Sequence, residues 1–173
     1  MKLNIIFFLG IVVLGGLSCT DSGKNQLKVE DDYFINPIFS SGSNPNALFY
    51  GGKYYYTHET NDMILLWETN DITDMGSAVC KEVWRPTDPK SMHNLWAPEI
   101  HRINDKWYIY YAADDGNTDN HQIYVLENDA RTPMEGTFKQ KGPIMTNQEW
   151  NWGIHASTFV HKRCAVSYLV RMA

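Results

Sequence analysis

From Tyr33 onward, the hydrophobic positions follow the short alternating pattern of β-strands and not the spacing of helices. Aromatic and β-branched residues come in short runs, and clusters of Gly, Asn, Asp and Pro separate these runs. No stretch keeps apolar residues at spacings of three and four over three helical turns. The pattern therefore predicts an all-β chain.

One hairpin pattern recurs along the chain. Residues 44–57 align with residues 97–110 at a constant offset of 53, and each copy reads as a strand, a two-residue turn and a strongly aromatic second strand. A third copy begins at His155, 58 residues after Ala97, and then loses the pattern. The repeat makes Asn44, Ala97 and His155 equivalent positions.

A second pair of strands follows each hairpin. Residues 64–69 and 78–84 form this pair in the first unit, and residues 122–127 and 137–141 form it in the second. Four strands in about fifty residues is the size of a β-propeller blade. We therefore predict a β-propeller fold, of which this chain carries about two to three blades. The alternative is an open β-sandwich, which does not require a repeat of this kind.

The beginning of the chain has a different pattern. Lys2 precedes an apolar run, residues 3–17, which is short for a membrane span and typical of a secretory signal peptide. Ser18 then precedes Cys19, as in bacterial lipoproteins whose cysteine is acylated. We therefore expect residues 1–18 to be a lipoprotein-type signal peptide. An ordinary cleaved signal is the alternative.

This organisation predicts where the protein works. Residues 19–32 are polar and form a tether, and residues 33–173 form the partial propeller domain. We expect an exported lipoprotein that is anchored in the outer or cytoplasmic membrane and faces the periplasm or the cell surface. For Cys80 and Cys164 we expect unpaired buried thiols, with a single disulfide as the alternative.

Composition supports a folded domain and argues against a nucleic-acid partner. Hydrophobic residues make up 43% and aromatic residues 13% of the chain, which is enough for a sizeable core. The chain has 15 Lys and Arg against 20 Asp and Glu, a net charge of −5 that does not favour binding to phosphates. Three tryptophans inside predicted strands are expected in the core: Trp67, Trp84 and Trp107.

No motif predicts a metal or a cofactor. The chain has no phosphate-binding glycine loop and no paired metal-ligand histidine motif. The acidic segment 114–120 departs from the calcium loop of an EF-hand, so we interpret it as a polar hairpin loop with His121 as an ordinary turn residue.

The candidate functional residues lie where the inner strands begin. In a propeller these strands line a central channel, so the repeat brings Asn44, Ala97 and His155 to its mouth, with Glu99 two residues after Ala97. Further aromatic and polar side chains stand just before the second and third inner strands: His93, Asn94, Trp96, Trp150 and Trp152. Flat aromatic faces and amide groups suit sugar rings, so we expect these residues to bind a glycan. The alternative is that they are ordinary polar groups at strand ends.

Several motifs in register make a family resemblance specific. They are NPIF (36–39), SNP (43–45), GKYYYTH (52–58), NLWAPEIH (94–101), KWYIY (106–110) and AADDGN (112–117). From about Asn36 to His161 the chain resembles glycoside hydrolase family 43, of the arabinofuranosidase and xylosidase type. The resemblance implies a five-bladed β-propeller, of which this is an N-terminal portion, and inverting hydrolysis during plant polysaccharide breakdown. The partners it implies are oligosaccharides that contain arabinose, xylose or galactose.

The resemblance also implies a catalytic set that this chain lacks in part. In the family, an Asp in the first inner strand is the base, an Asp in the third tunes the acid, and a later Glu is the acid. Asn44 stands at the first of these positions and His155 at the second, and the chain ends before the third. Glu99 is a substitute base or a substrate contact. We therefore expect impaired hydrolysis.

Three functions remain open at this stage. The first is an impaired glycosidase. The second is a non-catalytic glycan-binding lipoprotein, and the third is a frameshift-truncated fragment that does not fold stably.

Overall fold

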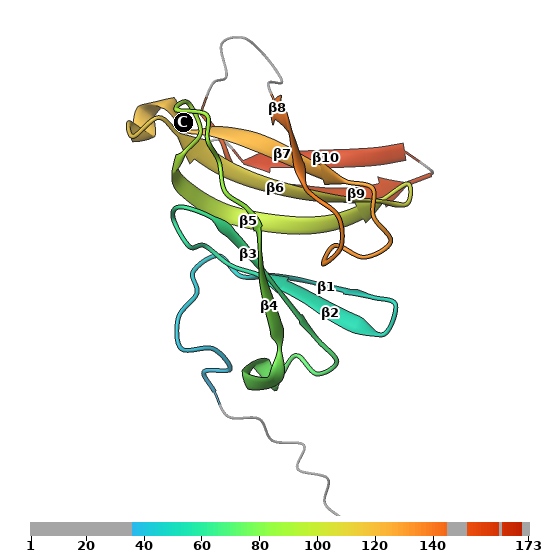
Figure 1. The fold of residues 1–173 in the computed structure, drawn as a ribbon. Helices are drawn as coiled ribbons and strands as arrows, with labels where there is room; N and C mark the ends of the chain where they lie inside the picture. Colours follow the sequence, from blue (N-terminus) through green and yellow to red (C-terminus); the bar gives the residue numbers. More distant parts are fainter. Residues whose placement is uncertain (1–35, 145–151, 163, 171–173) are drawn as a thin grey trace, which may run out of the picture. The chain divides into compact units, whose positions relative to one another are not determined.

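The computed structural model describes residues 36–144, 152–162 and 164–170, and their regular structure consists of β-strands with two short 3-10 turns (Figure 1). The strands are β1 (Asn46–Tyr50), β2 (Lys53–Thr57), β3 (Ile64–Thr69), β4 (Val79–Trp84), β5 (His93–Ile103), β6 (Lys106–Asp114), β7 (Gln122–Asn128), β8 (Lys139–Pro143), β9 (Ile154–His161) and β10 (Cys164–Val170), and the turns are η1 (Met75–Ser77) and η2 (Thr118–Asn120). The all-β prediction is confirmed. Within the described ranges, no helix is long and apolar enough to cross a membrane.

The strands form three antiparallel sheets. The first contains β1 to β4 in chain order, the second contains β5 to β8 in chain order, and the third pairs β9 with β10. A four-stranded sheet in chain order is the arrangement of a propeller blade, whereas the Greek-key connections of a sandwich would break this order. The described residues therefore form two blades and one hairpin of a third.

The two hairpin turns of the repeat have the backbone that the sequence predicts. Between β1 and β2, Gly51 and Gly52 have φ of +62° and +83°. Between β5 and β6, Asn104 and Asp105 have φ of +48° and +62°. Positive φ at both central residues suits a two-residue hairpin whose strands twist together, and Gly, Asn and Asp tolerate it best.

The second inner strand begins earlier than predicted. The repeat places its start at Ala97, but β5 begins at His93, so that Asn94 and Trp96 lie within the strand and not before it. The pairing of β5 with β6 shifts register on either side of Trp96, close to the positive φ of Asn94 and Ala97. Such irregularities let a strand bend without ending, and the alternation of side chains along the sequence does not reveal them.

The core joins the first blade to the second. The main buried cluster contains residues of both blades: Tyr55, Ile64, Leu66, Leu95, Ile100, Trp107, Ile109, Tyr111, Ala113, Tyr124, Leu126 and Phe138. Trp107 is fully buried on β6, and its ring meets Tyr50 and Tyr55 of the first blade edge-on, with centroids 5.3 and 5.2 Å away. The core prediction is thus confirmed for Trp107 and Trp67, while Trp84 is partly buried against the same cluster.

The prediction that the two cysteines are buried is wrong. Cys80 and Cys164 are free, as predicted, but both are exposed and not buried. Cys80 lies on β4, an edge strand of the first sheet, and Cys164 begins β10, which within the described residues pairs with β9 alone. An edge strand lacks the second neighbour that would cover such side chains. The predicted signal peptide and tether, with Cys19, lie outside the described residues.

Candidate functional site

The three repeat-equivalent residues share an uncommon backbone conformation. The φ angle is +48° at Asn44, +45° at Ala97 and +56° at His155. Asparagine tolerates this left-handed region, whereas it costs a residue such as alanine about 1 kcal/mol. Strain of this kind persists where the surrounding structure enforces it, and it concentrates at functional sites. The same conformation near the start of each inner strand therefore belongs to the repeat itself.

Contacts between the inner strands link the three units. The inner strand β5 contacts both β1 and β9. Between the first two, the backbone N–H of Ile100 donates to Oδ1 of Asn46 at 3.0 Å. Closer to the start of β5, the N–H of Leu95 donates to the carbonyl of Asn61 at 3.0 Å. The candidate residues Asn44, Ala97 and His155 thus lie on adjacent inner strands or, for Asn44, just before one.

Asn44 bonds to a carboxylate that no sequence pattern singled out. Its Nδ2 donates to Oε2 of Glu59 at 2.8 Å, and both residues are partly buried. The backbone N–H of Glu59 also donates to the carbonyl of Ser43 at 3.1 Å. Glu59 lies in the connection between β2 and β3, and only the path of that connection brings it beside Asn44.

Glu99 lies beside a histidine of its own strand. Its Oε2 lies 3.5 Å from Nε2 of His101, and both side chains are largely buried, at 17% and 13% exposure. The His101 ring in turn meets Tyr110 edge-on at 5.5 Å. In the part of the chain that the structure describes, Asn44 bonds to Glu59, and the Glu99 carboxylate lies beside the His101 ring.

A buried Asp–His pair lies beside two of the candidate tryptophans. Oδ2 of Asp114 lies 2.8 Å from Nδ1 of His121, and both side chains are 0% exposed. The His121 ring is 4.4 Å from the ring of Trp96 and 5.9 Å from that of Trp152, centroid to centroid. The His121 ring therefore packs against two indoles from different parts of the chain. Trp96 lies on β5, and Trp152 lies just before β9.

Hydrogen bonds keep the Asp114 carboxylate ionised. Burial raises the pKa of Asp114. Hydrogen bonds from His121, from the Asn94 amide and from the N–H of Gly116 lower the pKa by more than burial raises it, so the pKa lies below its ordinary value. The Asn94 Nδ2 lies 3.0 Å from both carboxylate oxygens, and the Gly116 N–H lies 2.8 Å from Oδ1. The predicted polar hairpin loop is present at residues 115–120, between β6 and β7, but the interpretation of His121 as an ordinary turn residue is wrong, because His121 is buried and bonds to Asp114. The strand β6 continues to Asp114, and η2 returns the chain so that His121 faces it.

The approach to the third inner strand is tied to the second blade. The Trp152 Nε1 donates to the carbonyl of Thr118 at 2.8 Å, and the N–H of Gly153 donates to the carbonyl of His121 at 3.0 Å. His93 is exposed at the start of β5. Trp150 lies outside the described residues.

The structure offers no metal centre in its described ranges. There, no group of three or more His, Cys, Asp or Glu side chains is placed to hold an ion. The buried His121 bonds to Asp114 through its Nδ1.

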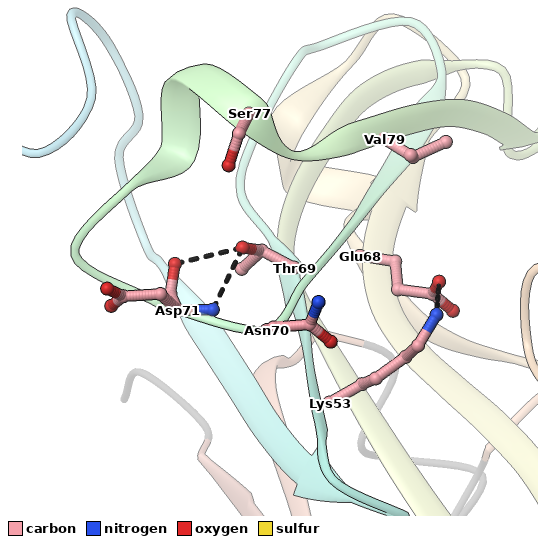
Figure 2. Close-up of a pocket in the computed structure, with 7 residues that line it drawn as sticks. All are labelled: Lys53, Glu68, Thr69, Asn70, Asp71, Ser77 and Val79. Atoms are coloured by element: carbon pink, nitrogen blue, oxygen red, sulfur yellow. Dashed lines mark hydrogen bonds and ion pairs between the residues drawn. The ribbon is translucent and has the colours of Figure 1, made fainter.

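A separate polar pocket lies on the first blade (Figure 2). It is lined by Lys53, Glu68, Thr69, Asn70, Asp71, Ser77 and Val79. The Thr69 hydroxyl donates to the carbonyl of Asp71 at 2.9 Å and accepts from its N–H at 3.1 Å, while Lys53 forms an ion pair with Glu68. Most of its polar groups thus bond to each other, and none of the predicted site residues lines it.

Known sequences agree with the family resemblance. The profile of the glycosyl hydrolases family 43 matches residues 34–173. The extracellular exo-α-(1→5)-L-arabinofuranosidase of Streptomyces chartreusis is 34% identical over 75% of this chain and 40% of its own length. The enzyme of the same name from Streptomyces avermitilis is 33% identical over 73% of this chain and 27% of its own length. The chain thus spans less than half the length of these relatives.

Known structures agree with the fold. The crystal structure of an α-L-arabinofuranosidase from Lactobacillus brevis superposes with a TM-score of 0.72 at 25% identity, over 78% of this chain and 45% of that one. A thermostable family-43 glycoside hydrolase superposes with a TM-score of 0.63 at 21% identity, over 79% of this chain and 44% of that one. The propeller fold is thereby confirmed.

Proposed function

Because the chain belongs to glycosyl hydrolases family 43, we propose that it binds the terminal arabinose units of arabinose-containing oligosaccharides at the starts of β1, β5 and β9. Oligosaccharides that contain xylose or galactose are the neighbouring substrate classes. The observation that carries the proposal is the shared left-handed backbone at Asn44, Ala97 and His155, which marks one location in three successive units. The activity of the arabinofuranosidases named above supports the choice of sugar.

Side chains near these positions suit a furanose ring. Trp96 and Trp152 are partly buried, and their rings flank the buried His121. A partly exposed indole offers an apolar face to the C–H bonds of a sugar, and amides such as Asn44 bond its hydroxyl groups. Glu99 and the exposed His93 are further candidates for hydroxyl contacts.

We propose that this site hydrolyses natural glycans slowly. Inverting hydrolysis needs a carboxylate that accepts a proton from water and a carboxylic acid that protonates the leaving oxygen. Asn44 stands at the family's base position, and an amide does not accept that proton. Unless another carboxylate takes this role, the loss of a general base lowers a rate by about a hundred- to ten-thousand-fold. His155 stands at the second carboxyl position of the family.

A second candidate is a glycan-binding lipoprotein without catalysis. It is favoured by the same two replacements, Asn44 and His155, together with the apolar run that precedes Cys19. The two relatives described as extracellular support export. Acylation of Cys19 would be measured by mass spectrometry of the mature N-terminus, and an unmodified N-terminus at another residue would exclude it.

The 173-residue chain is expected to bind α-1,5-arabinotriose with a dissociation constant in the micromolar to millimolar range, about that of glycosidases for their substrates. Isothermal titration calorimetry measures it. The Trp96→Ala variant is expected to bind about fivefold more weakly, since an aromatic contact contributes about 1 kcal/mol. Cellotriose, a glucose trimer, is the control ligand. Absence of heat with arabino-, xylo- and galacto-oligosaccharides alike would overturn the proposed function.

A further inference from the structure

We propose that Glu59 is the catalytic base of this site and that Asn44 orients the water from which Glu59 takes a proton. The inference rests on the proposed function, since it assigns a role within the same site. It gives the site a carboxylate that the sequence motif lacks at Asn44.

The bond between the two side chains gives each a defined role. Because Nδ2 of Asn44 donates to Oε2 of Glu59 at 2.8 Å, the Oδ1 of Asn44 is turned away from Glu59. None of the described residues donates a hydrogen bond to this Oδ1, so it is free to accept one from a water or a sugar hydroxyl. The Oε1 of Glu59 is likewise left to accept a proton. A water between these two oxygens would be oriented by one and deprotonated by the other.

The backbone places Glu59 at the mouth of the site. Its N–H is bonded to Ser43, the residue before Asn44. Two residues later, Asn61 forms a bridge with Leu95, whose N–H donates to it at 3.0 Å, next to Trp96. The connection after β2 therefore runs from the start of β1 to the start of β5, and it carries Glu59 between them.

Glu59 also differs from other glutamates of the chain in its surroundings. Glu68 pairs with a lysine, Glu82 pairs with Arg85, and Glu127 pairs with two lysines. Among the described residues, Glu59 has no Lys, Arg or His within ion-pair distance and accepts only from the neutral amide of Asn44. The amide of Asn44 holds one oxygen of this carboxylate in place and leaves the other oxygen without a protein donor among the described residues.

The step balances without a further protein group when the leaving group is a stable anion. A water oxygen forms a bond to the anomeric carbon, and one of its protons moves to Glu59. The bond from the anomeric carbon to the leaving oxygen breaks, and its electron pair departs with that oxygen. A dinitrophenolate leaves as the anion, so no acid is needed. A natural glycan additionally requires a proton from a carboxylic acid, the general acid of inverting glycosidases.

The test is therefore the hydrolysis of 2,4-dinitrophenyl α-L-arabinofuranoside by the 173-residue chain. The wild-type chain is expected to release dinitrophenolate above the uncatalysed rate. The Glu59→Gln variant is expected to lose about a hundred- to ten-thousand-fold in kcat while KM changes little, because glutamine keeps the shape and loses the base. Asp62→Asn is the matched control, since Asp62 lies in the same connection but is exposed and pairs with Arg85 at 3.2 Å. Its rate should equal that of the wild type.

Calorimetry with arabinotriose separates the two proposals. If the wild type binds but Glu59→Gln hydrolyses the aryl substrate as fast as the wild type, Glu59 is not the base and the proposed function stands. Binding without any hydrolysis by the wild type overturns the role of Glu59 in the same way. If the wild type does not bind, both proposals are wrong. A thermal melt of each variant checks that it is folded.

Discussion

The Asp114→Ala variant is expected to lose about 3–5 kcal/mol of folding free energy, the usual cost of removing one partner from a buried pair. Asp114 is 0% exposed and accepts from His121, Asn94 and the N–H of Gly116. Alanine would leave the donors of these three residues without their acceptor inside the protein. Each buried group without a partner adds a penalty of about 1–3 kcal/mol.

Urea unfolding followed by tryptophan fluorescence measures this loss, with Asp119→Ala as the control. Asp119 is exposed, and its side chain is not part of the buried pair, so its replacement should change stability by about 0.5 kcal/mol or less. Equal unfolding midpoints for Asp114→Ala and the wild type would show that the pair does not stabilise the fold.

The same carboxylate predicts the direction of a pH effect. The pKa of Asp114 is lowered in the folded chain, so its contribution to stability is fully present above the ordinary carboxyl pKa of about 4. The contribution is lost as the pH falls through the lower pKa of the folded state. Unfolding midpoints of the wild type should therefore fall in this acidic range more steeply than those of Asp114→Ala.

The Trp107→Ala variant is expected to lose about 3–5 kcal/mol as well, through the cavity that it leaves. Trp107 is 0% exposed on β6, and its ring contacts Tyr50 and Tyr55 of the first blade. The variant therefore weakens the packing between the two blades, in addition to the core of its own blade.

Thermal unfolding measured by circular dichroism tests this expectation. Phe49→Ala is the matched control, because Phe49 is 59% exposed and packs mainly on the neighbouring Tyr54. Its loss should stay below about 1.5 kcal/mol. If Trp107→Ala melts no lower than Phe49→Ala, the blades do not depend on a shared core. A single cooperative transition of the wild type would also exclude an unstable fragment.

The repeat accounts for the features that the sequence predicts well, namely the hairpins and their turns. Asn44, Ala97 and His155 occupy the same place in successive hairpins, and they share one backbone conformation although their side chains differ. The turn residues Gly51–Gly52 and Asn104–Asp105 carry their own conformational preference. A turn of this kind is set by the residues within it, so it can be predicted from the sequence.

The contacts that the sequence does not predict depend on how segments pack. Glu59 meets Asn44 from 15 positions away, through the path of the connection after β2. His121 meets Asp114 only because η2 turns the chain back over the end of β6. Burial of Cys80 was wrongly expected because composition does not tell an edge strand from a central one. None of these contacts leaves a periodic pattern along the chain.

The central claim is that the starts of the three inner strands form one arabinose site. Two-dimensional NMR of the isotope-labelled 173-residue chain, titrated with α-1,5-arabinotriose, tests it most directly. The account predicts that the amide signals of Asn44, Trp96 and His155 shift together along one binding curve. No shift at these residues, or shifts confined to the polar pocket beside Asp71, would contradict it.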